Sequence, residues 1–567
     1  MCGIYCCISA RGHCELDPED ARILGRRGPD ALTTHKTTIT TDTHVWYLTF
    51  TASVLALRGA QVQVQPIVDQ PSGSILCWNG EAWNFDGQPV PDNDTHFIST
   101  ILFEACKHSS DVEGDVLKVL SKISGPYAFV FYDAKSLKLY FGRDALGRRS
   151  LTVDDRCDND ANLTIASVVG KSIGTTAQEI KTAQVYLLDL KQPQLALTAL
   201  RYETFSPRIN KAVPIQPISL SDTPSTQAVS NLVDKLTTSL QLRVQGIPTY
   251  TAINDSEDPA KVAILFSGGL DCTLIARLCH ELLPKDQPID LLNVAFENPR
   301  VVNARSSSKI ASRCASDVDT YEACPDRLTG RSSFAELVKV CSERQWRFVV
   351  INIPYEDFLE HRSNIIQLMY PHNTEMDLSI TAALYFAARG QGSVATPGDD
   401  TFYKPYTTTA RVLLSGLGAD ELFGGYARHT AAFTRAGYEG LNDELEIDFM
   451  RIGTRNLGRD DRVISHWGKE TRYPFLDEKF VEFALSLPAW EKCGFRTGNP
   501  VPKHFEIAPA ARAIEDLHPE KMLLRCAMWH LGMKGAAAEK KRAIQFGART
   551  AKMIGGKTKG TDIVSVD

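Results

Sequence analysis

The chain has 567 residues, of which 43% are hydrophobic, so it can form about two to four domains with buried cores. Its formal net charge of −6 gives no overall positive field, and we therefore expect neither nucleic acid nor a membrane surface as a partner. The sequence has no apolar run of about 18 residues and no signal-peptide pattern, so we expect a cytoplasmic protein.

The sequence has 14 cysteines, which in a chain without a signal pattern are better explained as reduced thiols than as a disulfide framework. Four of them, Cys2, Cys6, Cys7 and Cys14, lie close together near the start. They lack the C-x-x-C pairs of a zinc site, so we expect Cys6 and Cys7 to be strand residues.

Cys2 directly follows the initiator methionine, so removal of Met1 makes it the N-terminal residue. Such a cysteine carries a thiol and an α-amine on one carbon. The amine, with a pKa of about 7.7–8.0, can act as the base for the thiol. A buried, inert cysteine is the alternative, and these residues alone favour it.

Residues 40–140 alternate short apolar, β-branched runs with turn residues, which predicts a strand-rich domain of two sheet layers with helices outside. Asn79-Gly80-Glu81 predicts a type I′ hairpin. A hairpin tip also presents an amide side chain and N–H groups of the kind that form an oxyanion hole, although spacing alone favours the hairpin without that role. We expect strands in 44–57, 74–78, 127–132 and 137–143, and helices in 97–106 and 116–123.

Several short motifs occur in an order that resembles the class II glutamine amidotransferase domain. They are Cys2-Gly3-Ile4, Arg27-Gly28-Pro29-Asp30, Leu57-Arg58-Gly59, Gln65-Pro66, Asn79-Gly80-Glu81-Ala82-Trp83-Asn84, Asn93-Asp94-Thr95 and Gly142-Arg143-Asp144-Ala145-Leu146-Gly147. The resemblance implies an α+β domain of the αββα sandwich type, which we place at residues 2–200. Trp83 stands where that family more often has tyrosine.

The same resemblance implies that the domain hydrolyses glutamine to glutamate and ammonia. Cys2 would attack the amide and form a thioester, with Asn79 and the N–H of Gly80 as the oxyanion hole. Arg58 would hold the α-carboxylate of glutamine and Asp94 its α-ammonium. One cation and one anion at opposite corners suit a zwitterionic amino acid. The glutamine-binding residues would thus be Arg58, Glu81 and Asp94.

The rest of the chain is predicted to be an α/β domain. Residues 201–225 are rich in Pro and Ser and are expected to be a linker, followed by a domain at 226–555 and a flexible tail at 556–567. The polar stretch 301–326 is expected to be a mobile loop. Buried parallel strands are expected at 262–266, 291–296, 348–353 and 412–414, with a helix at 273–283.

Two glycine motifs follow predicted strands. Ser267-Gly268-Gly269-Leu270-Asp271 precedes a helix, so its N–H groups can form an anion nest, although a plain strand-to-helix turn can use the same residues. No Gly-Lys-Ser/Thr follows, which excludes a Walker A loop. The second motif, 415–426, contains Asp420. Asp271 and Asp420 thus end two strands, where both can share Mg²⁺ with a polyphosphate.

These motifs, together with 472–477 and 484–488, resemble the ATP pyrophosphatase domain of asparagine synthetase. The resemblance implies ATP and Mg²⁺ as cofactors and aspartate as a substrate beside glutamine. ATP would adenylate a carboxylate with release of pyrophosphate, and ammonia would displace AMP. Lys541 is our choice for the cation that stabilises this adenylation, with a solvated charge run as the alternative. The nucleotide site would be lined by Leu265, Ser267, Gly268, Gly269, Phe296, Ser415 and Gly416.

Two departures qualify this likeness. Leu417 stands where authentic asparagine synthetases commonly have glutamate, and residues 540–547 match only loosely. With the stretch 301–326, they bring the chain closer to the branch of asparagine synthetase domain-containing proteins. We expect a glutamine-dependent, ATP-consuming amide-forming enzyme. The alternatives are a different carboxylate acceptor, or a scaffold or regulator that binds without coupled turnover.

Overall fold

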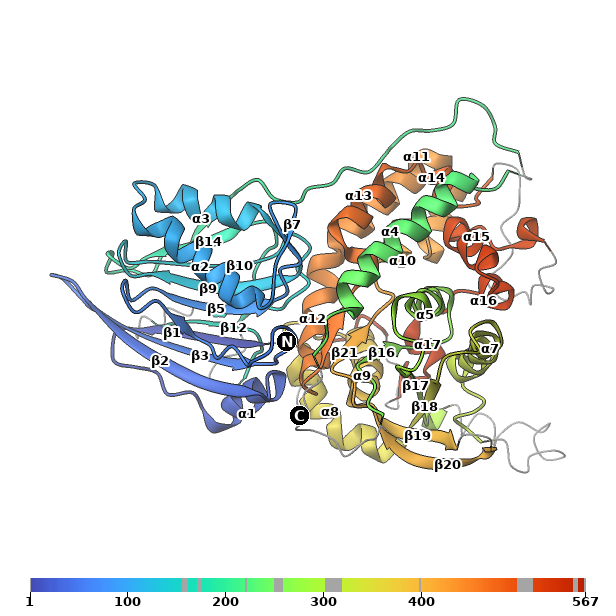
Figure 1. Cartoon of the computed structure of the whole chain (residues 1–567), viewed down its shortest axis with the longest axis horizontal. Helices are drawn as coiled ribbons and strands as arrows, with labels where there is room; N and C mark the ends of the chain where they lie inside the picture. Colours follow the sequence, from blue (N-terminus) through green and yellow to red (C-terminus); the bar gives the residue numbers. More distant parts are fainter. Residues whose placement is uncertain are drawn as a thin grey trace.

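The computed structural model describes residues 2–154, 162–170, 176–219, 222–248, 258–300, 319–396, 399–496, 513–553 and 559–564. Two antiparallel six-stranded sheets form the N-terminal half, in the orders β13-β11-β12-β1-β3-β2 and β15-β14-β10-β9-β5-β4 (Figure 1). The first has β1 (Gly3–Ser9), β2 (Ala31–Thr40), β3 (Val45–Val54), β11 (Thr152–Asp154), β12 (Leu163–Ala166) and β13 (Gln178–Glu179). The second has β4 (Ile67–Val68), β5 (Ile75–Gly80), β9 (Tyr127–Asp133), β10 (Lys138–Arg143), β14 (Val185–Asp189) and β15 (Thr198–Leu200).

Alternation along β1 explains how these layers stack. Ile4, Cys6 and Ile8 enter the core between the two sheets, whereas Tyr5 and Cys7 face outward. The outward face packs against α1 (Pro18–Arg27), and the far face of the second sheet packs against α2 (Asp94–Lys107) and α3 (Val112–Ser121). The αββα sandwich is therefore confirmed. A small sheet of β6 (Asn84–Phe85), β7 (Gln88–Pro89) and β8 (Ile123–Ser124) completes this half.

The hairpin predicted at Asn79-Gly80 is wrong. Both residues belong to β5, where they pair with Ala128 and Tyr127 of the neighbouring strand β9. Glycine is needed at position 80 because the backbone of Pro126 lies so close that a Cβ there would be 2.6 Å from its carbonyl oxygen. The Asn-Gly dipeptide thus ends a strand, and the chain continues past Tyr127 without reversing.

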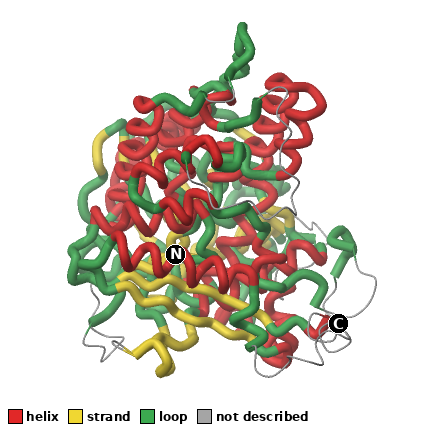
Figure 2. The backbone as a smooth tube through the Cα atoms, turned by 90° about the vertical axis from the view of Figure 1, so that its right-hand side faces the viewer, coloured by secondary structure: helices red, strands yellow, loops and turns green. Residues whose placement is uncertain are grey.

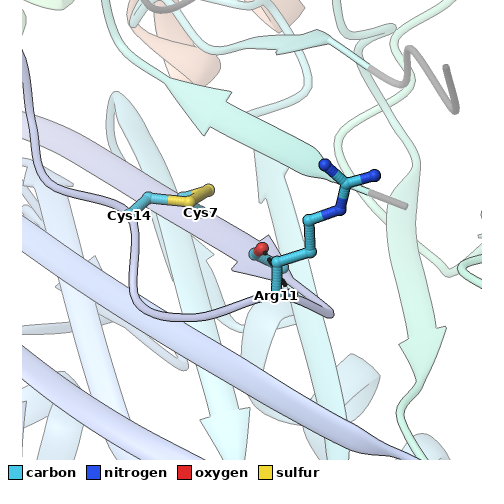
Figure 3. Close-up of a disulfide and its surroundings, with 4 residues drawn as sticks. Cys7, Arg11 and Cys14 are labelled. Carbon is cyan, nitrogen blue, oxygen red and sulfur yellow. Dashed lines mark hydrogen bonds between the residues drawn. A yellow bond between two sulfur atoms is a disulfide. The ribbon is translucent and has the colours of Figure 1, made fainter. Parts of the chain in front are cut away.

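The expectation of reduced thiols is wrong for one pair. Cys7 and Cys14 form a disulfide, with their Cα atoms 6.4 Å apart, and Figure 3 shows it beside Arg11. The loop after β1 folds back over the outward face of that strand, which brings Cys14 to Cys7. The other cysteines in the described ranges are free, and Cys6 and Cys7 are strand residues as predicted.

A seven-stranded sheet forms the C-terminal half, in the order β20-β19-β18-β17-β16-β21-β22. The strands β18, β17, β16, β21 and β22 are parallel, and the first four of them were predicted. β19 and β20 add an antiparallel edge. Neighbouring residues of one strand face opposite layers, Ala263 toward one helical layer and Ile264 toward the other. The strands are β16 (Val262–Leu265), β17 (Ile289–Phe296), β18 (Trp346–Ile353), β19 (Gln391–Thr396), β20 (Asp399–Thr407), β21 (Val412–Leu414) and β22 (Glu470–Arg472).

Helices cover both faces of this sheet, which confirms the α/β class (Figure 2). One face packs mainly against α4 and α5, and the other mainly against α8 and α9. The helices are α4 (Thr226–Val244), α5 (Leu270–Leu282), α7 (Pro325–Val340), α8 (Tyr355–Met369), α9 (Glu375–Arg389), α10 (Ala419–Phe423), α11 (Ala427–Ile452), η2 (Gly453–Leu457), α12 (Gly458–Ser465), η3 (Pro474–Leu476), α13 (Glu478–Ser486), α14 (Ala489–Lys492), η4 (Ile514–Asp516), α15 (Met522–His530), α16 (Lys534–Ala538) and α17 (Ile544–Gly547).

Three irregular segments compare differently with the expectations. Residues 201–219, the described part of the expected linker, form no helix. The boundaries of the two domains stay predictions. Most of the loop expected at 301–326 lies outside the described residues, and its end is helical because α7 begins at Pro325. The tail was expected to be flexible, yet its described part is anchored: Ile563 pairs with Thr374, and the N–H of Glu375 donates to Asp562.

Charged side chains are buried where the two halves meet. They alternate in sign, and each contacts the next: Arg27 to Asp461 at 2.8 Å, Asp461 to Arg149 at 3.8 Å, Arg149 to Glu470 at 3.1 Å, Glu470 to Arg472 at 2.6 Å and Arg472 to Glu81 at 3.0 Å. We call these six residues the interface ion-pair network. No helix in the described ranges is both long and apolar enough to cross a bilayer.

Asp461→Ala tests the contribution of this network to stability. The substitution removes the carboxylate that both Arg27 and Arg149 contact, and we expect the free energy of unfolding to fall by about 3–5 kcal/mol. Chemical denaturation of the full-length chain measures the change. Asp443→Ala is the control, because it removes a partner of exposed Lys211 and should leave the unfolding curve unchanged. An equally small effect of Asp461→Ala would contradict the expectation.

Candidate active sites

Cys2 lies at the start of β1, at the end of the first sheet that faces the C-terminal half (Figure 1). Its main-chain nitrogen donates to Asn79 Oδ1 at 3.0 Å. The other end of that amide, Nδ2, is buried and finds no acceptor among the described residues. Burial raises the pKa of the Cys2 thiol, so ionising it needs a nearby base or a partner for the negative charge. A nucleophile and an unused buried donor therefore stand side by side.

Four charged residues, Arg58, Glu81, Asp94 and Glu470, share one pocket with Cys2 and Gly80. Asp94 Oδ2 accepts from Trp78 Nε1 at 3.0 Å and from the N–H of Ala82 at 2.9 Å. Burial raises the pKa of Asp94, although these donors oppose the shift. Arg58 and Glu81 line the same pocket, as the sequence predicts. The pocket therefore presents both signs of charge to a small ligand.

Arg58 and Glu81 form the polar corner of this pocket. The Arg58 guanidinium donates to the carbonyl oxygens of Ala82 at 2.8 Å and Val90 at 2.6 Å, which fix its plane. Its Nε lies 3.9 Å from Glu81 Oε2. Burial and the neighbouring Glu470 carboxylate raise the pKa of Glu81 to about 8, against the opposing charge of Arg472. Glu81 thus lies between arginines from both halves of the chain.

Three further residues at this pocket are absent from the predicted set. Arg27 Nε donates to the carbonyl oxygen of Cys2 at 3.2 Å, and Gln65 Nε2 lies 3.8 Å from Cys2 Sγ. Arg27 and Gln65 belong to motifs that resemble the glutamine amidotransferase domain. Their presence in those motifs could have identified them as site residues. Glu470 of β22 also lines the pocket, and nothing in its local sequence indicates that.

A second, larger cavity lies at the carboxyl ends of β16 and β21. The predicted residues Leu265, Ser267, Asp271, Ser415 and Gly416 line it, as do Asp420 and Lys541. Parallel strands end at the same edge of a sheet, which is why two motifs that lie far apart in the sequence meet here.

Three predicted nucleotide-site residues, Gly268, Gly269 and Phe296, do not line this second cavity. Gly268 packs on α7 with φ of +78°, and a Cβ there would lie 2.4 Å from the nitrogen of Gly330. Phe296 is fully buried and packs edge-on against Phe386, with ring centres 5.6 Å apart. Gly269 lines a smaller cavity together with Ser267 and Asp271.

Two lysines hold the carboxylates at this edge. Lys521 Nζ lies 2.6 Å from Asp271 Oδ2 and 2.5 Å from Asp420 Oδ1, and Lys541 also contacts Asp420. Although burial opposes the shift, the two lysines lower the pKa of Asp420 below its ordinary value. The sequence predicted Lys541 but missed Lys521, because no local pattern shows that residue 521 returns to the ends of β16 and β21.

Leu417 lines the second cavity, but a carboxylate is present close by in the chain. Glu421 of α10 lines the same cavity and is 3% exposed. Its Oε1 accepts from the Tyr426 hydroxyl at 2.6 Å, whereas its Oε2 has no hydrogen-bond partner in the described part of the chain. Burial and the charge of Asp420 raise the pKa of Glu421. The cavity therefore keeps an acidic group despite the apolar residue at 417.

Comparisons with known proteins match both halves of the chain. The glutamine amidotransferase domain family matches residues 1–198, and the asparagine synthase family matches residues 401–442 and 433–531. The asparagine synthetase domain-containing protein 1 of Bos taurus is 32% identical, over 99% of this chain and 97% of that protein. The asparagine synthetase domain-containing protein of Saccharomyces cerevisiae is 34% identical, over 90% of this chain and 86% of that protein.

The glutamine-hydrolysing asparagine synthetase of Rattus norvegicus is more distant, at 23% identity over 86% of this chain and 77% of that protein. The two matched domains are those of a glutamine-dependent, amidotransferase-like enzyme. Because the similarity to the domain-containing proteins exceeds 30% over nearly the full length, this chain belongs to the family of asparagine synthetase domain-containing proteins.

Proposed function

We propose that the protein hydrolyses glutamine at Cys2 and uses the ammonia to amidate a carboxylate that ATP has activated in the second cavity. Aspartate is the first candidate for that carboxylate. The observation that carries the proposal is the buried Nδ2 donor of Asn79, which has no partner among the described residues. Asn79 accepts from the Cys2 nitrogen, and Cys2 lines a pocket with charges of both signs. A buried donor without a partner is costly, and a negative charge that develops on a substrate oxygen would satisfy it.

In the first step the Cys2 thiolate attacks the side-chain amide of glutamine. The α-amine of Cys2, free once Met1 is removed, takes the thiol proton and passes it to the leaving ammonia. Asn79 Nδ2 and the N–H of Gly80 stabilise the oxyanion, and water then cleaves the thioester to glutamate. Arg58 binds the α-carboxylate, and Asp94 with Glu81 binds the α-ammonium.

The residues at the second cavity fit a Mg²⁺-bound triphosphate. Asp271 Oδ1 is buried and accepts no hydrogen bond from the described residues, and Asp420 lies in α10, the helix that follows the adjacent strand β21. Carboxylate oxygens are the ligands that Mg²⁺ prefers, so Asp271 and Asp420 would hold the ion. When bound, Mg²⁺ neutralises charge on the phosphates. Lys521 already contacts both carboxylates and Lys541 contacts Asp420, so both lysines would pair with phosphate oxygens.

The acceptor carboxylate attacks the α-phosphate of ATP, which forms an acyl adenylate and releases pyrophosphate. Ammonia then attacks the acyl carbon, the bond to the AMP oxygen breaks, and one proton leaves the nitrogen. We assign that proton to Glu421, which lines the same cavity as Leu417 and whose Oε2 has no hydrogen-bond partner among the described residues. Leu417 also favours a second candidate function, amidation of a carboxylate other than aspartate, because an apolar side chain replaces a charge in the acceptor region.

The direct test supplies ATP, Mg²⁺, glutamine and aspartate to Met-processed protein and follows pyrophosphate and asparagine together. Equal amounts of both would support the aspartate proposal. Pyrophosphate release that depends on another acid would support the second candidate. Glutamate without pyrophosphate under every acid tested would refute the synthetase half of the proposal and leave a glutaminase.

Cys2→Ala should abolish glutamine hydrolysis, because no other group in the pocket can form the thioester. Synthesis driven by added ammonium salt should continue, since it bypasses the first pocket. The measurements are glutamate release and ammonia-dependent pyrophosphate release from the same preparation. Glutamate release that survives in Cys2→Ala would refute the nucleophile assignment.

Asp271→Asn should spare glutamine hydrolysis and lower ATP turnover by about 100-fold or more, because a neutral amide is a weaker ligand for Mg²⁺ and leaves Lys521 with only one carboxylate. Pyrophosphate release across a Mg²⁺ titration measures the loss. Asp290→Asn is a control for removal of a buried carboxylate elsewhere in the same sheet, where Asp290 accepts from Tyr406 and Thr408. Unchanged ATP turnover in Asp271→Asn would exclude the metal role.

A further inference from the structure

Glu81 of the glutamine pocket is held by a residue from the other half of the chain. Its Oε1 accepts from Arg472 of β22 at 3.0 Å, and its Oε2 faces Arg58. Glu81 is 3% exposed, so the direction of its carboxylate depends on these two partners rather than on water. Arg58 is 3.9 Å away, and the nearer partner is therefore Arg472.

Arg472 is itself fixed at every guanidinium nitrogen. Nε donates to Glu470 at 2.6 Å, one terminal nitrogen donates to the carbonyl oxygen of Arg243 at 2.7 Å, and the other donates to Glu81. The Trp83 ring lies 4.9 Å from the guanidinium carbon. Because each of the three guanidinium nitrogens donates a hydrogen bond, the side chain cannot shift without a shift of β22 or a lost contact.

The backbone of the same residue reaches the second cavity. The carbonyl oxygen of Arg472 accepts from the N–H of Ser415 at 3.0 Å, and Arg472 is in register with Leu414 of β21. Ser415 and Gly416 line the second cavity. One residue therefore contacts the glutamine pocket through its side chain and the loop of the second cavity through its carbonyl group.

We propose that Arg472 is the positioning residue that holds the Glu81 carboxylate ready for the α-ammonium of glutamine and links its position to the Ser415 loop. The inference rests on the proposed function, because it assumes that glutamine occupies the first pocket. Arg472 also opposes protonation of Glu81, because its charge lowers the pKa of this carboxyl while burial and Glu470 raise it. Without the arginine, Glu81 would bind a proton more readily and attract an ammonium group less.

A link of this kind has a thermodynamic consequence. A nucleotide that displaces the Ser415 loop changes the position of Arg472, and so changes the affinity for glutamine. By linkage, glutamine changes the affinity for the nucleotide by the same factor. Removing the contact between Arg472 and Glu81 should uncouple the two affinities even where both pockets stay intact.

Two conservative arginine variants separate this role from a general role at the interface. Arg472→Lys keeps the charge but loses the fork that reaches Glu470, Arg243 and Glu81 at once. Arg149→Lys is the matched control, because Arg149 is equally buried, pairs with Glu470 at 3.1 Å and donates to the β22 carbonyl of Thr471 at 3.0 Å. Within the described ranges, Arg149 contacts Asp461, Glu470 and Thr471 and does not pair with Glu81.

Calorimetry measures glutamine binding to full-length Cys2→Ala protein, with and without ATP and Mg²⁺. Steady-state kinetics of the Cys2 enzyme then separates KM from kcat. Arg472→Lys should raise the glutamine Kd and KM by about tenfold, change kcat less, and remove the effect of ATP on Kd. Arg149→Lys should change the glutamine Kd by less than about threefold and keep the ATP effect.

Equal changes in the two arginine variants would overturn the assignment of Arg472 and leave the proposed function standing. Absence of glutamine binding to the Cys2→Ala protein would overturn the proposed function and this inference with it. If Arg472→Lys fails to fold, Glu81→Gln tests the same contact from the other side and keeps the shape of the side chain. It should also raise the glutamine Kd and remove the ATP effect, and a retained ATP effect would refute the link.

Discussion

Six buried charges, arranged with alternating sign, join the two halves of the molecule. Taking ions out of water is costly, and the interface ion-pair network offsets the cost because most of its members contact two charges of opposite sign. The network begins at the residue that donates to the Cys2 carbonyl group and ends at Glu81, which lines the same pocket as Cys2. The geometry of the Cys2 pocket therefore depends on side chains that the C-terminal half supplies.

Most of the fold could be predicted from the sequence, because apolar alternation and strand-to-helix glycine motifs are local signals. The strand at 127–132 and the parallel strand at 412–414 match β9 and β21 within a residue. The hairpin at Asn79 failed for a physical reason. An Asn-Gly pair favours a turn only when the backbone needs that conformation, whereas Gly80 is required by the close approach of Pro126. No dipeptide reveals which neighbour the folded chain brings near.

The candidate sites could be predicted only where a motif carries the chemistry. Cys2 and Asp94 share a pocket, and Asp271 and Asp420 meet at one sheet edge, as the motif order implied. Lys521 could not be found in this way, because its importance comes from a tertiary contact rather than from its neighbours in the sequence. The same holds for the pairing of Cys7 with Cys14, which depends on how the loop after β1 folds back.

The strand β22 lies at the edge of the C-terminal sheet that faces the N-terminal half. This three-residue strand ends the C-terminal sheet, and the open backbone of an edge strand is a template for pairing with other chains. Here Arg149 of the N-terminal half donates a hydrogen bond to the carbonyl oxygen of Thr471 at this edge. The αββα sandwich lies against that side of the sheet (Figure 1). The glutamine amidotransferase half thus occupies an edge of the C-terminal sheet that would otherwise be open to another strand.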